Sequence, residues 1–440
     1  GHSFPEPGNL NRMIRSLARD TGIAYSAEQE QAIRAAATSG LLLITGGPGT
    51  GKTTILNGIL ELLGQMQLKC LLAAPTGRAA KRLTEVTGEE ASTIHRLLEA
   101  SIDTNTGKMF FVRDEDNPLK CDAVIVDEMS MVDVQLLHSL LKAVPAGKRL
   151  ILVGDPDQLP SVGAGNLLHT LTRCEKIPIV RLTEIFRQAQ ESCIIRSAHR
   201  IVSGELPDLQ EKQGDFFFFD RRDAGEALEL VRGLYAKRLP NAYGFYPQTD
   251  IQVISPTRKG VLGTVNLNQV LQETVNPPAY GKAILKNLIY TFREGDKVMQ
   301  TQNQYDTEWT RDGERGAGIF NGDMGTVVAV DKSTHTMQVD FDERMVRYTA
   351  EQLEHLELAY AVTVHKSQGS EFEAVILVLP ENTERLSYRS LLYTAVTRAK
   401  KLLILIGAPR KVYDMVQNHY LTKRDSCLET MLIRMTGDLA

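Results

Sequence analysis

The sequence lacks the features of a disulfide-rich, metal-bound or membrane-spanning protein. Its five cysteines have no paired spacing, which argues against a zinc site or a disulfide framework and favours a reducing cytoplasm of bacterial type. No run of about 18 apolar residues is present and no basic-then-apolar export signal begins the chain, so we expect no membrane partner. The chain begins Gly1-His2-Ser3, which is typical of a cleaved tag, so we expect a natural protein that extends further upstream.

An excess of positive charge is also missing. The 440 residues include 50 Lys and Arg against 54 Asp and Glu, which gives a net charge of −4. This balance is typical of an ordinary globular protein. It neither requires nor excludes a nucleic-acid partner, because phosphate binding depends on where the cations cluster. The length favours two main domains with smaller insertions.

Short apolar runs bounded by turn residues recur along the chain and predict parallel strands. Helix-like or polar sequence separates each run from the next, and the pattern of the first half returns in the second. We therefore expect an α/β protein with two α/β domains. The predicted strands are residues 41–44, 70–74, 123–126, 150–153, 177–182, 251–254, 361–364, 374–379 and 402–406.

Two stretches interrupt this pattern. Residues 99–121 are polar and rich in turn residues, and they predict a β-hairpin inserted in the first domain. Residues from about 295 to 356 alternate polar and apolar side chains, with turns at Asn321-Gly322 and Asp331-Lys332. They predict a small β-barrel inserted in the second domain.

The strongest motif is a glycine-rich loop. Residues 46–53 (GGPGTGKT) follow a predicted strand and precede a helix-like segment, the context of a phosphate-binding loop. Backbone N–H groups would surround the phosphates, Lys52 would reach the β- and γ-phosphates, and the hydroxyl of Thr53 would bind Mg²⁺. The alternative is a glycine-rich turn without a ligand. We expect ATP and Mg²⁺ as cofactors, with contacts from Gly47, Pro48, Gly49, Thr50, Gly51, Lys52, Thr53 and Thr54.

Polar residues end the two strands that follow. One strand ends in Asp127 and Glu128, which would place Asp127 near Mg²⁺ and Glu128 where it could polarise an attacking water. The next leads to Gln158, a neutral amide that can sense a γ-phosphate without cancelling its charge. Taken alone, the first segment is better interpreted as a common strand end and the second as a surface turn. Their order behind the loop favours a catalytic set that includes Lys52.

With these motifs in order, the sequence resembles the RecD-like helicases of superfamily 1 (SF1B), the family that includes the exodeoxyribonuclease V alpha subunit. The resemblance extends from about residue 26 to residue 401. The matching segments are SAEQEQA at 26–32, APTGRAA at 74–80, STIHRL at 92–97, GDPDQLP at 154–160, LTEIFRQ at 182–188, residues 360–372 and YTAVTR at 393–398.

The resemblance implies two RecA-like P-loop NTPase domains with insertions. These would be residues 26–190, with the hairpin at about 99–121, and residues 191–440, with an SH3-like barrel at about 282–357. Longer relatives have helix-hairpin-helix elements before the first motif. Here residues 1–25 are expected to be a helical remnant, and the apolar face that includes Ile14 and Leu17 predicts a packing helix rather than a DNA-binding module.

The resemblance also assigns roles to individual residues. Gln29 would contact adenine and Phe186 would stack on it, while the segment of Gly369 and Glu371 would bind the ribose. Two further residues would be arginines that stabilise charge on the γ-phosphate, namely Arg187 and Arg398. A surface position for Arg187 and a core position for Phe186 are the alternatives.

Candidate DNA contacts combine small donors with cations, which grip phosphates without reading bases. A helix N-cap for Thr76, a core position for His95 and a solvated loop for Arg258 are the alternatives. The candidates are Thr76, Gly77, Arg78, Thr93, His95, Arg258, Thr363, His365 and Lys366.

The resemblance implies an ATP-dependent helicase or translocase that moves 5′ to 3′ on single-stranded DNA and acts at duplex junctions. Single-stranded-DNA-binding or recombination proteins are further candidate partners. Alternatives are an ATPase stimulated by single strands that does not unwind, an RNA helicase, a P-loop phosphotransferase or kinase, and a scaffold that keeps its nucleotide as a structural ligand.

Overall fold

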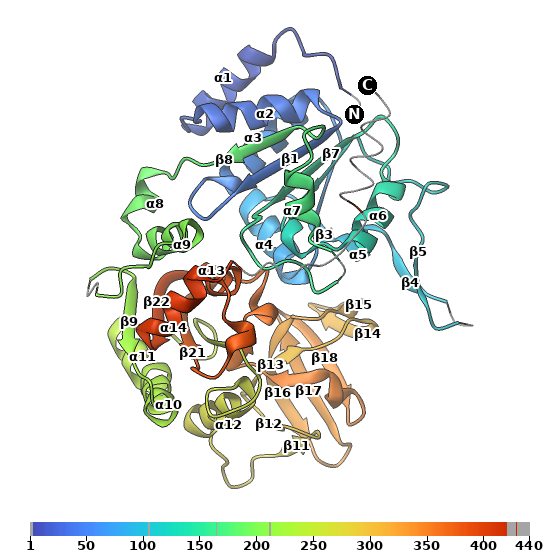
Figure 1. The fold of residues 1–440 in the computed structure, drawn as a ribbon. Coiled ribbons are helices and arrows are strands. Elements are labelled where there is room, and N and C mark those ends of the chain that lie inside the picture. Colours follow the sequence, from blue (N-terminus) through green and yellow to red (C-terminus); the bar gives the residue numbers. More distant parts are fainter. Residues whose placement is uncertain (1–2, 104–105, 164, 211–212, 420–427, 429–440) are drawn as a thin grey trace. The chain divides into compact units, whose positions relative to one another are not determined.

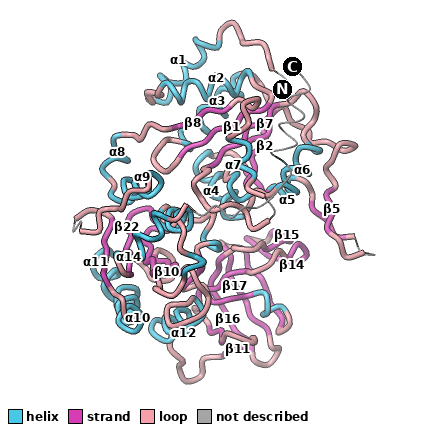
Figure 2. The backbone as a smooth tube through the Cα atoms, viewed as in Figure 1, coloured by secondary structure: helices cyan, strands magenta, loops and turns pink. Residues whose placement is uncertain are grey.

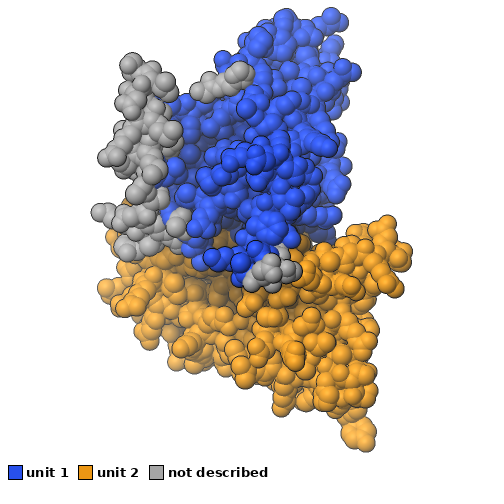
Figure 3. Space-filling model, turned by 90° about the vertical axis from the view of Figure 1, so that its right-hand side faces the viewer, with its two compact units in different colours: residues 1–191, 421–440 blue, residues 192–420 orange. Residues whose placement is uncertain are grey.

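The structure is a computed structural model that describes residues 3–103, 106–163, 165–210, 213–419 and 428. The chain forms two compact units. Unit 1 contains residues 1–191 and unit 2 contains residues 192–420 (Figure 3). In the described part of the chain, no helix is both long and apolar enough to cross a membrane.

A six-stranded parallel sheet is the centre of unit 1. Its strands are β1 (Leu41–Gly46), β2 (Cys70–Ala74), β3 (Ala91–Thr93), β6 (Ala123–Val126), β7 (Arg149–Gly154) and β8 (Ile179–Leu182). They pair in the order β3-β2-β6-β7-β1-β8. Figure 1 labels β8, β1, β7 and β3 of this sheet. Along β1, Leu42 and Ile44 join the core on one face while Leu43 joins the core on the other. The sheet is therefore buried on both faces, as its apolar strands require.

Helices cover the two faces of this sheet. One core contains residues of α1 (Leu10–Thr21), α2 (Ala27–Thr38), α3 (Lys52–Gln65) and α4 (Gly77–Thr87). The other contains residues of α5 (Ile94–Leu97), α6 (Val134–Ala143) and α7 (Leu167–Thr172). The expected packing helix is α1, whose Ile14 and Leu17 are buried. The remaining helical segments are η1 (Met129–Met131) and α8 (Arg187–Glu191).

A short hairpin leaves the sheet of unit 1 where the sequence predicts one. Strands β4 (Ala100–Ile102) and β5 (Met109–Phe111) pair antiparallel, with Ala100 opposite Phe111. Met109 and Phe110 are each 47% exposed, so the outer strand presents apolar side chains to solvent.

Unit 2 has a second parallel sheet, with five strands. They are β9 (Phe216–Asp220), β10 (Ile251–Ser255), β20 (Ala361–Thr363), β21 (Phe372–Leu379) and β22 (Ala399–Gly407), in the order β20-β10-β21-β22-β9. The helices are α9 (Cys193–Ser203), α10 (Ala224–Gly233), the π-helix η2 (Leu234–Arg238), α11 (Leu239–Tyr243), α12 (Thr264–Val275), α13 (Arg389–Val396) and α14 (Pro409–Gln417). Three 3-10 helices are η3 (Gln352–His355), η4 (His365–Ser367) and η5 (Glu384–Leu386).

A seven-stranded antiparallel sheet is formed by residues that lie between β10 and β20 in the sequence. Figure 2 labels β14, β15, β16 and β17 of this sheet. Its strands are β13 (Lys297–Gln300), β14 (Gln304–Arg311), β15 (Glu314–Ile319), β16 (Met324–Asp331), β17 (Thr336–Phe341), β18 (Arg344–Thr349) and β19 (Leu356–Leu358). A separate two-stranded sheet, β11 (Ile284–Lys286) with β12 (Thr291–Arg293), precedes it. Both expected turns are present, before β16 and between β16 and β17.

The expected α/β fold is confirmed. A strand occupies the position of each of the nine apolar runs, and all pairings within the two large α/β sheets are parallel. The exact limits of the expected domains and insertions stay predictions.

Candidate active site and nucleic-acid interface

The glycine-rich loop connects the end of β1 to the start of α3. A Cβ atom on Gly46 would lie 2.6 Å from Oγ1 of Thr50, which leaves no room for a side chain at this position. Gly51 has φ of +80°, a conformation that L side chains rarely adopt, directly before the first turn of α3. The hydroxyl of Thr50 donates to the carbonyl oxygen of Gly47 at 2.8 Å and closes the loop. The loop thus ends at a helix N-terminus, where free backbone N–H groups and the helix dipole favour the binding of a phosphate.

Two acidic residues follow β6, which is separated from β1 by β7 in the same sheet. Glu128 has φ of +55°, and its backbone N–H donates to Oδ1 of Asp127 at 2.7 Å. Burial, and then the charge of Glu128, raises the pKa of Asp127, while the charge of Lys52 acts in the opposite direction. The left-handed backbone of a non-glycine residue beside a half-buried carboxylate is a feature that clusters at functional sites.

Gln158 follows β7 at the same edge of the sheet. Its Nε2 donates to Oδ2 of Asp155 at 3.3 Å, and both side chains are buried. Its Oε1 is buried without a hydrogen-bond partner among the described residues. One half of this amide is thereby held in place while the other half remains available to a ligand.

Gln29 and Phe186 meet at the loop. A Cβ atom on Gly51 would lie 2.5 Å from Nε2 of Gln29 and 2.6 Å from Cε2 of Phe186. The Oε1 of Gln29 accepts from the backbone N–H of Ser26 at 3.0 Å in a capping box, while its buried Nε2 has no partner among the described residues. The backbone N–H of Phe186 donates to the carbonyl oxygen of Gly49 at 3.2 Å. An amide donor and an aromatic ring therefore lie side by side at the loop.

The carboxyl ends of parallel strands share one edge of a sheet, which explains why these site residues from distant parts of the sequence lie at the same edge. The loop, Asp127, Gln158 and Phe186 follow β1, β6, β7 and β8, respectively. Thr53 and Thr54 lie in the first turn of α3, and Thr53 is exposed. One contributor was not expected from the sequence. The charge of Arg82, on α4, lowers the pKa of Asp127, and no local motif identifies it.

The DNA candidates of unit 1 follow β2 and β3. Thr76 and Thr93 cap α4 and α5, because their hydroxyl oxygens accept from the N–H groups of Ala79 and Arg96 at 3.2 and 3.1 Å. Each hydroxyl keeps its own hydrogen for a donor bond, so capping and phosphate binding are compatible. Gly77 and Arg78 form the first turn of α4.

His95 lies beside the hairpin. Its ring centroid is 5.8 Å from that of Phe111, and burial lowers its pKa. A neutral imidazole can still donate one hydrogen bond, but it adds no positive charge to the surface near neutral pH.

The candidates of unit 2 separate into two sets at opposite edges of its sheet. Thr363 ends β20, while Arg258 follows β10, so these residues lie at the carboxyl edge together with His365 and Lys366 of η4. The other set, Gly369, Glu371 and Arg398, precedes the first residues of β21 and β22 and lies at the amino edge. The sequence alone did not reveal this separation.

Arg398 is almost fully buried in unit 2, with 2% of its surface exposed. Its Nε donates to the carbonyl oxygen of Thr394 at 3.0 Å, and its two terminal nitrogens donate to the carbonyl oxygen of Ser370 and to Oγ1 of Thr397, both at 3.1 Å. The guanidinium must exchange some of these bonds before it can bind a phosphate. Arg187 begins α8, but its side chain lies outside the described part of the structure.

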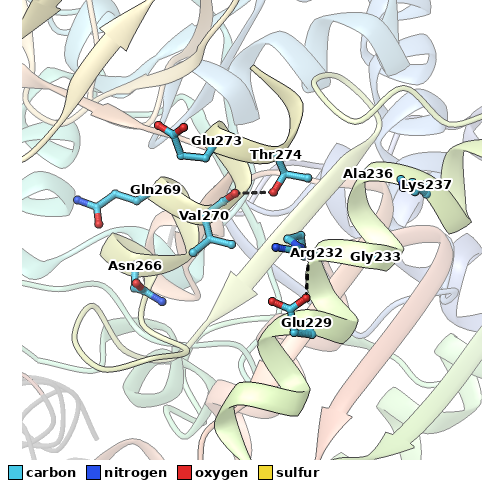
Figure 4. A pocket seen from close by; sticks show the side chains of 10 residues that line it. All are labelled: Glu229, Arg232, Gly233, Ala236, Lys237, Asn266, Gln269, Val270, Glu273 and Thr274. Carbon is cyan, nitrogen blue, oxygen red and sulfur yellow. Dashed lines mark hydrogen bonds and ion pairs between the residues drawn. The ribbon is translucent and has the colours of Figure 1, made fainter. Parts of the chain in front are cut away.

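A pocket of about 640 Å³ lies elsewhere in unit 2, between α12 and the helical segment of α10 and η2 (Figure 4). Arg232 in this pocket pairs with Glu229 at 2.9 Å. None of the candidate site residues lines it, and its charges are largely paired, so it adds nothing to the sites described above.

Models of known families match three stretches of the chain. These are an AAA domain over residues 29–164, the ATP-dependent RecD-like DNA helicase SH3 domain over residues 267–341, and the UvrD-like helicase C-terminal domain over residues 358–406. The matches lie in both units, and the second of them includes strands β13 to β17 of the antiparallel sheet.

Two solved helicases share the fold. A Bacteroides Pif1 bound to single-stranded DNA is 18% identical with a TM-score of 0.52, over 95% of this chain and 98% of that chain. The Pif1 helicase of Candida albicans is 20% identical with a TM-score of 0.51, over 95% of this chain and 100% of that chain. At this level of identity the likenesses concern the fold alone, and they support RecA-like parallel sheets in this chain.

Curated relatives are more similar in sequence. The ATP-dependent RecD2 DNA helicase of Deinococcus radiodurans is 39% identical over 402 residues, which are 91% of this chain and 51% of that protein. This chain therefore spans about half the length of that relative. The RecBCD enzyme subunit RecD of Mycolicibacterium smegmatis is 32% identical over 92% of this chain and 74% of the subunit. Given this extent of identity, the chain belongs to the RecD-like family of superfamily 1 helicases.

Proposed function

We propose that this chain is an ATP-dependent DNA helicase that moves 5′ to 3′ along single-stranded DNA and separates the strands at duplex junctions. Membership of the RecD-like family supports this function, since the Deinococcus radiodurans relative is named as an ATP-dependent DNA helicase. The observation that supports it most directly is the set of Lys52, Asp127 and Glu128 at one edge of a parallel sheet. Phosphoryl transfer needs such a combination of a phosphate-binding cation, a metal ligand and a water-polarising base.

The residues of unit 1 fit a nucleoside triphosphate. Gly46 and Gly51 leave space that a side chain would fill, and Gln29 directs a buried, unpartnered amide donor to the same place. An adenine ring offers acceptors for that amide and a face for Phe186. The loop N–H groups and Lys52 would hold the phosphates.

Thr53 and Asp127 would hold Mg²⁺, because hydroxyl and carboxylate oxygens are the ligands it prefers. No cluster of three or more His, Cys, Asp or Glu suited to a metal occurs among the described residues, which suits an ion held by few protein groups and the phosphates. When bound, Mg²⁺ supplies charge that neutralises the β- and γ-phosphates. Thr53 and Asp127 would orient it.

The remaining residues would couple hydrolysis to movement. Glu128 would accept a proton from the attacking water, and the free Oε1 of Gln158 would sense the γ-phosphate. Arg187 and Arg398 would stabilise its charge during transfer. Because Arg398 donates three hydrogen bonds within unit 2, its engagement would rearrange Thr397 and Ser370 and the segment that leads to the DNA candidates.

The DNA candidates contact phosphates with hydroxyl groups and cations from both units, so we expect strong dependence of binding on salt and little sequence preference. Single-stranded DNA and junctions are the proposed substrates. Single-stranded-DNA-binding or recombination proteins are proposed partners, and the bacterial cytoplasm is the proposed compartment.

An unwinding assay tests the proposal. Duplexes with a 5′ tail or a 3′ tail are incubated with the protein, with and without ATP, and ATP hydrolysis is followed with and without single-stranded DNA or RNA. We expect DNA-stimulated hydrolysis and unwinding of the 5′-tailed duplex alone. Hydrolysis at the same rate with and without an oligonucleotide would contradict a motor, and stimulation by RNA alone would indicate an RNA helicase.

A further inference from the structure

Glu357 connects two of the DNA candidates of unit 2. Its Oε1 accepts a hydrogen bond from a terminal nitrogen of Arg258 at 2.7 Å, and its Oε2 accepts from Nζ of Lys366 at 2.8 Å. Each carboxylate oxygen therefore pairs with one cation. Arg258 follows β10, Lys366 lies in η4, and Glu357 lies in β19, so three separate segments meet at one side chain.

The position of Glu357 is set by the backbone. In β19 it lies opposite Met299 of β13, between the buried Leu356 and Leu358, so the alternation of a strand directs it to the other face. Asn287 fixes the strand further, because its amide donates to the carbonyl oxygen of Leu356 at 3.1 Å. The backbone of Glu357 is thus fixed by the antiparallel sheet, independently of the two cations.

Of the three side chains, the acid is the most buried and Arg258 the most exposed. Glu357 is 18% exposed and Lys366 is 24% exposed, whereas Arg258 is 47% exposed. The acid lies at the base of the cluster, and Arg258 keeps much of its surface for a ligand. Two positive charges and one negative charge leave a net charge of one, which matches a single DNA phosphate.

A gain in stability does not explain this arrangement. Ion pairs at a protein surface contribute little to stability, since solvent screens them and ordering the side chains costs entropy. The effect of Glu357 on phosphate binding is more direct than its effect on stability, because its carboxylate already accepts hydrogen bonds from groups of Arg258 and Lys366 that a phosphate would use. A DNA-binding site that must release DNA in every cycle benefits from a competing carboxylate, since both cations pair with it again when the phosphate leaves.

We propose that Glu357 is a built-in counter-charge that competes with a phosphate of single-stranded DNA for Arg258 and Lys366. It would limit the strength with which unit 2 holds DNA and speed the release of each phosphate. The inference rests on the proposed function, and it adds a positioning residue from the antiparallel sheet that the motifs do not include.

The test is Glu357→Gln, which keeps the shape of the side chain and removes its charge. Binding of a fluorescent oligo-dT to the full chain is measured by anisotropy, without nucleotide, between about 50 and about 200 mM salt. We expect binding about 5-fold tighter at low salt, the scale of one charge interaction at about 4 Å in water. We also expect a slope of log K against log salt that is steeper by about 0.7, the value for one further phosphate contact on a single strand. Dissociation of the oligonucleotide should slow in parallel.

Glu373→Gln is the matched control. Glu373 also lies between two lysines of unit 2, with Lys401 at 2.7 Å and Lys400 at 4.0 Å, but neither lysine is a DNA candidate. The same change of net charge should therefore leave the salt slope as it is in the unchanged protein. If both variants bound oligo-dT more tightly by the same factor, the change in net charge alone would explain the result, and the proposal would be overturned.

Lys366→Gln, alone and combined with Glu357→Gln, supplies an independent readout. If the carboxylate competes for Lys366, loss of that lysine should cost more affinity when Glu357 is neutral than when it is charged. Additive effects, or weaker binding by Glu357→Gln in a protein with an unchanged melting temperature, would overturn the proposal. Failure of the unchanged chain to bind oligo-dT would instead reject the proposed function itself.

Discussion

The ammonium group of Lys52 donates a hydrogen bond to the carbonyl oxygen of Gly46, and the two atoms lie 2.6 Å apart. The lysine is therefore folded back onto its own loop, above the end of β1. A phosphate bound by the loop would replace that carbonyl oxygen as the acceptor, and the exchange of a neutral partner for a charged one favours binding.

Lys52→Ala should abolish ATP turnover while the protein remains folded, because the loss removes the cation that reaches the β- and γ-phosphates. Steady-state hydrolysis in the presence of single-stranded DNA measures the effect. Lys69→Ala is the control, since Lys69 is an exposed lysine of unit 1 just before β2. DNA-stimulated turnover that survives in Lys52→Ala would show that the loop is not the site of hydrolysis.

Glu128→Gln should slow hydrolysis by about 10²-fold or more and leave ATP binding intact, since it removes the proposed general base. Single-turnover hydrolysis and nucleotide binding separate the two effects. Glu99→Gln is a suitable control, because Glu99 is another glutamate of unit 1 with a left-handed backbone, at φ of +53°. Unchanged turnover in Glu128→Gln would exclude the role as base.

Gly51→Ala should weaken nucleotide binding by about 10-fold or more, a loss of about 1.4 kcal/mol or more. The new methyl group would collide with Gln29 and Phe186, the two proposed base contacts. Gly88→Ala controls for backbone strain, since Gly88 has φ of +73° and a Cβ atom added there would meet no other atom within 4 Å. Both variants should lose about 1–2 kcal/mol of stability from the left-handed backbone, but only Gly51→Ala should lose nucleotide affinity.

Nucleotide binding should depend on pH through Asp127. Burial raises its pKa, so at mildly acidic pH part of this carboxyl group is protonated, and Mg²⁺ must displace that proton. The affinity for Mg²⁺-nucleotide should therefore fall as the pH is lowered from about 8 to about 6, a range in which ordinary carboxylates stay ionised. Asp127→Asn should weaken binding and remove most of this dependence. Identical pH profiles in the two proteins would contradict a role for Asp127 as metal ligand.

Much of the fold follows from the sequence because parallel strands buried on both faces need continuous apolar runs. The strands that the runs did not identify are short or lie at an edge. β3 has three residues at one edge of its sheet, and in β9 only Phe216 is fully buried while Phe217 to Phe219 remain half-buried. Such strands have a weak apolar pattern, so local reasoning does not separate them from loops.

The site residues also fall into those that the sequence could identify and those that it could not. Lys52, Asp127 and Gln158 could be proposed from the sequence because each lies within a few residues of the carboxyl end of a strand, and these ends converge at one edge. The partners of Arg258 and Arg398 could not be proposed, because they depend on contacts between distant segments. Nothing near Arg258 in the sequence indicates that Glu357 pairs with it, and nothing near Arg398 indicates its bond to Ser370.

Unit 2 contains a buried acid whose loss should be costly. The carboxylate of Asp296 is fully buried, and it accepts hydrogen bonds from the side chains of Gln272 and Asn276, each at 2.6 Å, and from the hydroxyl of Tyr360 at 2.9 Å. The backbone N–H of Arg293 donates to it at 2.7 Å. This side chain thus ties α12 to β12 and to the residue that precedes β20.

Asp296→Ala should lower the free energy of unfolding by about 3 kcal/mol or more, because several buried donors would lose their acceptor at once. Four hydrogen bonds favour the ionised form of Asp296, but burial outweighs them and raises its pKa. Because loss of the charge also removes the cost of burying it, Asp296→Asn should be milder than the alanine variant. Denaturant unfolding measures both. Asp306→Ala, at an exposed position of β14, is the control and should change stability by about 0.5 kcal/mol or less. Equal effects at the two positions would mean that the network around Asp296 does not stabilise unit 2.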